Sequence, residues 1–508
     1  MNDKRPNIVL ISVDSLRADH VSSYGYYRET TPNIDNLAKE GILFKNNISQ
    51  AYLTPISEMA VHTGMYPSSS GFFGFDTVLP KNITTLAQIL KSYDYRTAAF
   101  GSSPEFFIHP AILDSFNRGF DVYDFFNQPA EKISPETYRI DLVDQKKVLN
   151  FLKKDQEKPF FLWLPMGSAH FPYGKFSEIF RDKNYDGVFK DKILNFNWSN
   201  GVLPWIYKNN LYQQIDKGKI VAEKIDNKDI QYIIDSYDDD VLATDKFIGD
   251  FLSELKKNGL EENTIIVLQS EHGEDFGEHG YIMHYDIFDS TIKTPLIIKN
   301  PALNKKGVII EQQTQSINIL PTILDFLKIP IAHQIQGSSL IPLINGQNKD
   351  ENKYIFIERV PLWEKVMFGW FTLNKEKMSE SPKVEYFDFI IEKLSKFYTK
   401  EIIQYVRSSQ FLDQQDFAVR TNDWKLIYRK SKSFQEKYSW WKVLSGVDSQ
   451  IKDFELYDLK ADPKEQENVI EEYPSVADDL KEKLNIFFKK TESDKIIPQV
   501  KNTIQEYF

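Results

Sequence analysis

Residues 7–14 read NIVLISVD, an unbroken apolar run that ends at the carboxylate of Asp14. The run is rich in β-branched residues, which is typical of a parallel strand buried on both faces. Similar runs follow at 96–100, 160–164, 264–268 and 295–298. Helical patterns lie between the runs, at 34–39, 85–92, 143–153 and 230–257. This alternation predicts an α/β fold with a mixed, mostly parallel sheet flanked by helices.

Polar side chains follow several of these predicted strands. Asp14 ends the first run, Glu271-His272 follow TIIVLQS, and His170 follows FFLWLP. Ligands in α/β folds gather beyond the carboxyl ends of the strands, so we expect these groups to converge. Two carboxylates and an imidazole can hold one divalent ion: Mn, Mg, Ca or Zn. Taken singly, each residue could equally be a helix cap or a buried polar group.

Residues 51–67, AYLTPISEMAVHTGMYP, place a hydroxyl before a helix. Pro55 suits the first helical position, and Thr63-Gly64 close the stretch. Thr54 is therefore expected at a helix N-terminus, where free N–H groups and the helix dipole favour an anion. A hydroxyl there is a candidate nucleophile for a phosphate or sulfate ester. The alternative is that Thr54 only caps the helix.

Two histidines are candidates for acid catalysis or for binding of the ester anion. His170 could act as general acid on a leaving oxygen or bind the anion. His284, which closely follows the Glu271 segment, could bind anionic oxygens or simply pack. His279 is expected to shape its own loop.

The composition of the 508 residues limits the function. The formal net charge of −11 argues against general nucleic-acid binding, and the absence of cysteine excludes disulfides and thiolate chemistry. The first apolar run is too short for a leader or a membrane helix, and no other run approaches membrane-spanning length. We therefore expect a soluble, cytoplasmic protein.

Three regions are expected along the chain. Residues 1–359 form the catalytic α/β domain, with an irregular aromatic insert at 171–231 that is either a lid or a surface excursion. A second aromatic insert covers 360–415. Residues 416–508 form a smaller α+β domain with short strands and a helix from about 475 to 489.

Several motifs together resemble the sulfatase family, within the alkaline phosphatase superfamily. They appear in the family's order: PNIVLISVDSLRADHVSSYG, TPNIDNLAKEGILFKN, HTGMYP, HFPY, NGLEENTIIVLQSEHGEDFGEHGY, INILPTILDFLKI, AVRTNDWKLIY and ELYDLKADPKEQENV. The resemblance covers nearly the whole chain. It implies an α/β sandwich with a smaller C-terminal domain, and one divalent metal beside a nucleophile at a helix start.

Departures from the sulfatase pattern bear on the mechanism. Thr54 stands where sulfatases carry the cysteine or serine that becomes formylglycine, and Glu58 stands where they carry an arginine. Ser15 replaces a second ligand aspartate. Ser102 and Pro104 replace a lysine and a histidine that bind sulfate. The cationic groups that select sulfate are thus largely absent.

A threonine followed four residues later by glutamate resembles the nucleophile motif of lipoteichoic acid synthases. Those enzymes are threonine-dependent phosphoglycerol transferases, whose metal is bound by an N-terminal carboxylate, the threonine and an Asp-His pair. The resemblance implies that Asp14, Thr54, Glu271 and His272 bind the metal, with glutamate in place of one aspartate. The transferases carry membrane helices, which this sequence does not show.

The resulting hypothesis is a metal-dependent hydrolase or transferase of phosphate-type esters: a phosphodiester, phosphomonoester or phosphonate. Thr54 attacks, and His170, His284 and Glu58 contact the substrate, a small-molecule or a glycan- or lipid-linked ester. One alternative is a sulfuric ester hydrolase that works without formylglycine. Another is a catalytically silent member that binds a glycan or a partner.

Overall fold

The computed structural model describes most of the two predicted domains. Its described residues are 5–74, 77–101, 110–125, 145–154, 157–167, 169–176, 178–190, 206–208, 211–216, 219–280, 282–347, 352–359, 415–430 and 453–493. The predicted insert at 360–415 lies outside them except for Gln415, and so do Ser102 and Pro104.

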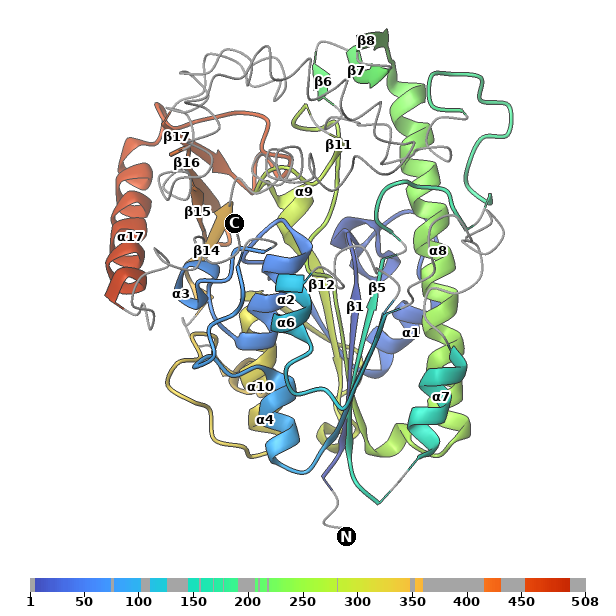
Figure 1. Ribbon diagram of the computed structural model, residues 1–508. Helices are drawn as coiled ribbons and strands as arrows, with labels where there is room; N and C mark the ends of the chain where they lie inside the picture. The colour runs from blue at the N-terminus through green and yellow to red at the C-terminus, as the bar shows by residue number, and fades with distance from the viewer. Residues whose placement is uncertain are drawn as a thin grey trace, which may run out of the picture.

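An eight-stranded sheet forms the centre of the larger domain (Figure 1). In spatial order its strands are β13 (Val308–Gln315), β2 (Ile42–Ile48), β12 (Lys293–Lys299), β9 (Thr264–Gln269), β1 (Asn7–Val13), β5 (Phe160–Met166), β3 (Arg96–Gly101) and β4 (Val122–Phe125). All neighbours pair in parallel except β12, which runs antiparallel to both β2 and β9. The predicted mixed, mostly parallel sheet is therefore confirmed.

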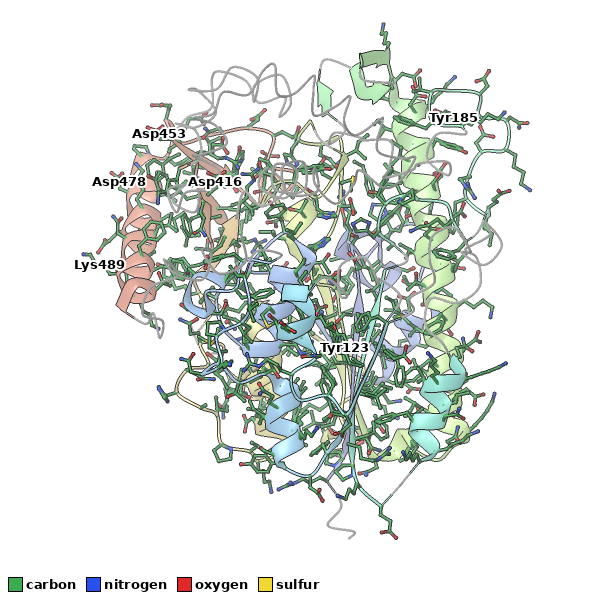
Figure 2. All side chains as sticks on the ribbon, viewed as in Figure 1. Tyr123, Tyr185, Asp416, Asp453, Asp478 and Lys489 are labelled. Carbon is green, nitrogen blue, oxygen red and sulfur yellow. The ribbon has the colours of Figure 1, made fainter. Side chains whose placement is uncertain are left out.

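Both faces of this sheet are covered by helices, as the apolar composition of β1 requires. Val9 and Ile11 point into one core, and Ile8 and Leu10 point into the other. The first core is closed by α1 (Pro32–Glu40), α7 (Gln145–Lys153) and α8 (Asn227–Lys257). The second is closed by α2 (Thr54–Thr63), α4 (Leu86–Ser92), α6 (Pro110–Phe116), α10 (Ile319–Phe326) and α11 (Ile341–Ile344). Figure 1 shows the sheet nearly edge-on between these layers, and Figure 2 shows the side chains that fill both.

A four-stranded antiparallel sheet forms the smaller domain. Its strands, in order, are β14 (Ile355–Arg359), β15 (Asp416–Arg420), β16 (Trp424–Tyr428) and β17 (Phe454–Asp458). One face packs on α17 (Pro474–Ser493), whose Asp478 and Lys489 point away from the sheet (Figure 2). The other face packs against residues before and within α2 and beside α9 (Asp289–Ile292). Since β14 precedes residue 360, this sheet draws strands from both sides of the predicted division.

Three strands of the large sheet, β2, β4 and β13, have no counterpart among the predicted runs. β13 is an edge strand whose second half is polar (QQTQ), yet Gln313, Thr314 and Gln315 are buried, and Gln313 Nε2 donates to the Lys353 carbonyl at 2.9 Å. In β2 the polar Asn47 is buried, and its Nδ2 donates to Thr294 Oγ1 and Ser316 Oγ at 3.1 and 3.2 Å. A buried strand can therefore contain polar residues when their side chains are hydrogen-bonded, and such a strand does not appear as an apolar run in the sequence.

The described start of the predicted insert at 171–231 is fastened to α8. Asp239 Oδ1 accepts from the backbone N–H groups of Ile179 and Phe180, and Asp240 accepts from those of Gly174 and Phe176. Further along, β6 (Ile206–Lys208), β7 (Leu211–Asp216) and β8 (Lys219–Lys224) form a small antiparallel sheet. In Figure 1 this sheet lies at the end of the molecule opposite the N-terminus. Within the described parts of the chain, no helix is both long and apolar enough to cross a membrane.

Candidate active site

Three neighbouring parallel strands end side by side and create the site. The register pairs Ser12 of β1 with Pro165 of β5 and with Gln269 of β9. Beyond these residues the Asp14 backbone N–H still donates to the Met166 carbonyl at 2.9 Å. The segments after β1, β5 and β9 therefore emerge at one edge, as expected for ligand sites in α/β sheets.

Asp14 is held by a turn directly after β1. Ser15 has a φ of 65°, a left-handed conformation that bends the chain away from the strand direction. The Tyr237 hydroxyl of α8 donates to the Ser15 carbonyl at 2.8 Å and accepts from the Arg17 N–H at 2.9 Å. Ser15 Oγ donates to Asp14 Oδ1 at 2.9 Å. The turn thus fixes one oxygen of the carboxylate and leaves the other for a ligand.

The helix α2 begins at Thr54, one residue earlier than expected from the sequence, which placed Pro55 at the first helical position. The capping residue is Leu53, whose apolar side chain makes no capping hydrogen bond. All ten residues of α2 are buried. Instead of capping, Thr54 Oγ1 lies 2.9 Å from His272 Nε2. The structure therefore places this hydroxyl against a predicted metal ligand, at a helix N-terminus.

Asp14, Glu271 and His272 form a compact buried group. One ligand-type atom of each lies within 4.8 Å of the others, and His272 Nε2 is 3.6 Å from Asp14 Oδ1. His272 Nδ1 lies 3.0 Å from the Gly273 carbonyl, an arrangement that directs the Nε2 lone pair toward Thr54 and Asp14. Asp14 Oδ2 and Glu271 Oε2 have no hydrogen-bond partner among the described residues. Buried carboxylate oxygens of this kind fit a divalent cation.

The pKa values of this group reflect crowded, buried charge. Burial raises the pKa of Glu271 well above its usual value, and the charges of Asp14 and Glu58 raise it further. Burial also raises the pKa of Asp14, but the neighbouring histidines outweigh it and the net pKa is lowered. Burial lowers the pKa of His272 to about 3, so its imidazole is neutral at pH 7. Neutral imidazole is the form that binds metal.

Glu58 lies at the same cavity, which is lined by Ser12, Asp14, Thr54, Glu58 and Glu271 together with the end of β5 and the residue that follows it. It follows Thr54 by one turn of α2, and residues four apart lie on the same face of a helix. Gln269 Nε2 donates to Glu58 Oε1 at 2.9 Å. The prediction placed Glu58 with the substrate; the structure places it beside the candidate metal ligands.

His170 and His284 lie next to this group. The His284 ring centroid is 4.1 Å from that of His272 and 5.1 Å from that of His170. His284 Nδ1 lies 3.0 Å from Glu274 Oε1, and the Tyr173 hydroxyl donates to Glu274 Oε2 at 2.8 Å. All seven predicted site residues are therefore brought to one region, while their chemical roles remain predictions.

His170, Glu274 and His284 form a second group with suitable ligand atoms within 4.8 Å. Both Glu274 oxygens are engaged, by His284 and by Tyr173. In the first group, by contrast, carboxylate oxygens lack hydrogen-bond partners among the described residues. This difference favours the first group as the metal site and makes Glu274 a residue that orients His284.

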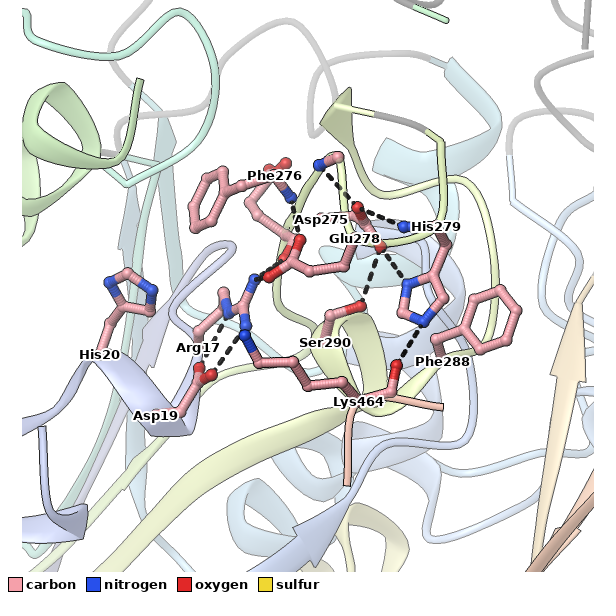
Figure 3. A network of polar contacts seen from close by, with 12 residues as sticks. Arg17, Asp19, His20, Asp275, Phe276, Glu278, His279, Phe288, Ser290 and Lys464 are labelled. Carbon is pink, nitrogen blue, oxygen red and sulfur yellow. Dashed lines mark hydrogen bonds and ion pairs between the residues drawn. The ribbon is translucent and has the colours of Figure 1, made fainter. Parts of the chain in front are cut away.

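A polar network joins this region to the smaller domain (Figure 3). The Arg17 guanidinium contacts Asp19 at 2.7 Å and Glu278 at 2.8 Å. On the other side of the Glu278 loop, His279 Nδ1 contacts Asp275, and His279 Nε2 lies 2.9 Å from the Lys464 carbonyl. These contacts fix the loop that leads to His284, and His279 shapes that loop as expected.

Sequence reasoning missed Glu274, Tyr173 and Arg17. Each lies within a few residues of a predicted site residue: Glu274 in SEHGE, Tyr173 in HFPY and Arg17 in VDSLR. The proximity of polar residues to candidate ligands was the available signal. The Tyr173–Glu274 contact spans 101 positions and the Arg17–Glu278 contact spans 261, so these two contacts could not be read from the sequence.

Comparison with known proteins identifies the family. A family model described as Sulfatase matches residues 6–329. An N-acetylglucosamine-6-O-sulfatase of Bacteroides thetaiotaomicron is 25% identical over 92% of this chain and 83% of its own length. An arylsulfatase of Clostridium perfringens is also 25% identical, over 86% of this chain and 96% of its own.

Solved structures share the fold at lower identity. One, in complex with its substrate D-glucosamine-2-N,6-O-disulfate, has a TM-score of 0.63 at 21% identity and covers 97% of this chain and 100% of its own. The phosphonate monoester hydrolase of Agrobacterium radiobacter has a TM-score of 0.66 at 19% identity and covers 96% of both chains. Because the family model spans well over half of the chain, this protein belongs to the sulfatase family of hydrolases.

Proposed function

We propose that this protein is a metal-dependent hydrolase or transferase that acts on phosphate-type esters through Thr54. The observation that carries the proposal is the position of Thr54 Oγ1, 2.9 Å from His272 Nε2 and at the same cavity as Asp14 and Glu271. A hydroxyl that capped the helix would stand at the N-cap position, which Leu53 occupies, whereas Thr54 is the first residue within the helix.

Asp14, Thr54, Glu271 and His272 would hold the metal. A divalent ion there would lower the pKa of the Thr54 hydroxyl and neutralise charge on the ester oxygens. Its identity stays open, because carboxylates suit Mg, Ca and Mn while imidazole suits Zn.

The protein's own groups perform the bond changes. Thr54 Oγ1, its proton lost to solvent, attacks phosphorus and forms a new P–O bond while the bond to the leaving oxygen breaks. His170 or His284 donates a proton to that leaving oxygen. Water or an acceptor hydroxyl then attacks phosphorus, gives its proton to the same histidine, and breaks the P–O bond to Thr54. Glu274 keeps His284 oriented, because its carboxylate holds Nδ1 on the side away from the substrate.

A second candidate is a sulfuric ester hydrolase, which the names of the relatives favour. Thr54 weakens this candidate, because an ordinary threonine sulfate lacks the hemiacetal route by which formylglycine releases sulfate. The relatives' names also favour a small-molecule or glycan ester as substrate for either reaction.

A substrate screen separates these candidates. Purified protein is supplied in turn with Mn²⁺, Mg²⁺, Ca²⁺ and Zn²⁺. Each sample is assayed on four substrates: p-nitrophenyl phosphate, bis(p-nitrophenyl) phosphate, p-nitrophenyl phenylphosphonate and p-nitrophenyl sulfate. We expect metal-dependent turnover of a phosphate-type ester that Thr54→Ala abolishes. Turnover of the sulfate ester alone would establish the second candidate, and no turnover of any ester would favour a silent, binding member.

A further inference from the structure

Three buried carboxylates meet at the cavity beside Thr54. Asp14, Glu58 and Glu271 are 4%, 1% and 1% exposed, and all three line this cavity. Each has one oxygen without a hydrogen-bond partner among the described residues: Asp14 Oδ2, Glu58 Oε2 and Glu271 Oε2. No lysine or arginine of the described chain forms an ion pair with any of them. In the ionised state each buried carboxylate would cost several kcal/mol, and a cation bound among the three would offset that cost.

The surroundings of Glu58 supply hydrogen bonds but no positive charge. Gln269 Nε2 donates to Glu58 Oε1 at 2.9 Å. The histidine closest to the other oxygen is His62, whose Nε2 is 3.7 Å from Glu58 Oε2. Burial lowers the pKa of His62 to about 3, so this imidazole is neutral and does not form an ion pair with Glu58. Its ring packs edge-on against Trp163 and Phe116, in an apolar environment.

We propose that Glu58 is a further metal-site residue, which contributes its carboxylate to the divalent cation held by Asp14, Thr54, Glu271 and His272. This inference rests on the proposed function, because it requires a cation at that site. The position of Glu58 on α2 gives the reason: Thr54 and Glu58 are four residues apart, so the nucleophile and the carboxylate face one cavity. The role differs from the substrate contact predicted for Glu58, since a carboxylate repels an anionic ester but attracts the cation.

Binding of Mn²⁺ alone tests the inference without any substrate. Mn²⁺ is titrated by calorimetry into chelator-stripped wild type, Glu58→Gln, Asp14→Asn and Glu358→Gln. Glu358 is an equally buried glutamate in β14 and serves as the matched control. We expect Glu58→Gln to weaken Mn²⁺ binding about 10- to 100-fold, and Glu358→Gln to leave it unchanged. Asp14→Asn should weaken it at least as much as Glu58→Gln.

The outcomes distinguish an error in the proposed metal site from an error in the role of Glu58. If Asp14→Asn binds Mn²⁺ like the wild type, the metal site of the proposed function is wrong. If Asp14→Asn loses binding while Glu58→Gln binds like the wild type, the metal site stands and Glu58 is only a neutral core acid. Glu58→Asp covers the case in which the glutamine variant does not fold. Glu58→Asp keeps the negative charge on a shorter side chain and should bind Mn²⁺ with an affinity between those of the wild type and Asp14→Asn. If Glu58→Gln does not fold and Glu58→Asp binds Mn²⁺ as tightly as the wild type, the inference is overturned.

Thermal unfolding gives a readout that a structural role would not reproduce. Without metal, Glu58→Gln should melt at the same temperature as the wild type or higher, because one of three crowded carboxylates is gone. With Mn²⁺, the variant should gain less in melting temperature than the wild type, since stabilisation by a ligand follows its affinity. A variant that melts lower without metal, yet gains as much from Mn²⁺, would contradict the inference.

Discussion

The ion pair between Arg17 and Glu278 should make stability depend on pH in the acid range. Arg17 Nη1 lies 2.8 Å from Glu278 Oε1, and the Glu278 side chain is 21% exposed. Burial raises the pKa of Glu278, but the charge and hydrogen bonds of Arg17 outweigh it and lower this pKa from 4.5 to about 2. Because the folded-state pKa is depressed, the carboxylate stabilises the fold above about pH 4.5, and this contribution is lost as pH falls toward 2.

The magnitude follows from the shift. At about 1.4 kcal/mol for each pKa unit, the full contribution is about 3 kcal/mol at neutral pH. Linkage predicts a loss of about 1 kcal/mol by pH 4 and about 2 kcal/mol by pH 3. The corresponding variant is Glu278→Gln, which keeps the shape of the side chain and removes the titrating charge.

Urea denaturation at pH 6, 5 and 4 measures the effect as the difference in unfolding free energy between wild type and Glu278→Gln. We expect the wild type to be more stable by up to about 3 kcal/mol at pH 6, and the difference to shrink by about 1 kcal/mol at pH 4. Glu254→Gln, which removes the exposed Lys257–Glu254 pair, is the control and should show a small difference at every pH. An equal difference for Glu278→Gln at pH 6 and pH 4 would refute the reasoning.

Three further changes probe the site and its support. Asp14→Ala or His272→Ala should remove most bound metal and activity, measured by elemental analysis and turnover; full metal occupancy in both variants would contradict the site. Thr54→Ser should keep part of the activity, because the hydroxyl stays but loses the rotamer restriction of a β-branched side chain; kinetics that show none would count against direct attack. Arg420→Met removes the two hydrogen bonds from the guanidinium to Asp289, while Lys425 stays 3.2 Å from this carboxylate. It should lower the unfolding free energy by about 2 kcal/mol, whereas a loss below about 1 kcal/mol in urea denaturation would show that the pair is dispensable.

Much of the fold follows from apolar runs such as residues 7–13, because a strand buried on both faces must be apolar throughout. The parallel strands β9, β1 and β5 are neighbours, so Asp14, His170 and Glu271 lie at one edge of the sheet. The proximity of these site residues could therefore be predicted from the sequence. Strands β2 and β13 were not predicted because polar residues interrupt their apolar runs. The structure buries some of these side chains in hydrogen bonds, as for Asn47 in β2 and Gln313 in β13.

What the sequence could not supply is the partner of each buried polar group. The engagement of Glu274 by Tyr173, 101 positions away, depends on tertiary packing and leaves no local pattern. The environment of Glu58 also depends on tertiary packing. Its carboxyl group lies beside Gln269 and His62 and has no cationic partner among the described residues. The suggestion that the insert at 171–231 closes over the substrate stays a prediction, although its described start is fastened to α8.

The nucleophile is the central claim, and mass spectrometry tests it most directly. The intact protein should have the mass of an unmodified threonine at position 54. With metal and a slow phosphoester substrate, rapid quenching and peptide mapping should find a phosphorylated species at Thr54, which Thr54→Ala cannot form. An intermediate that maps elsewhere, or full turnover by Thr54→Ala, would contradict covalent catalysis by Thr54.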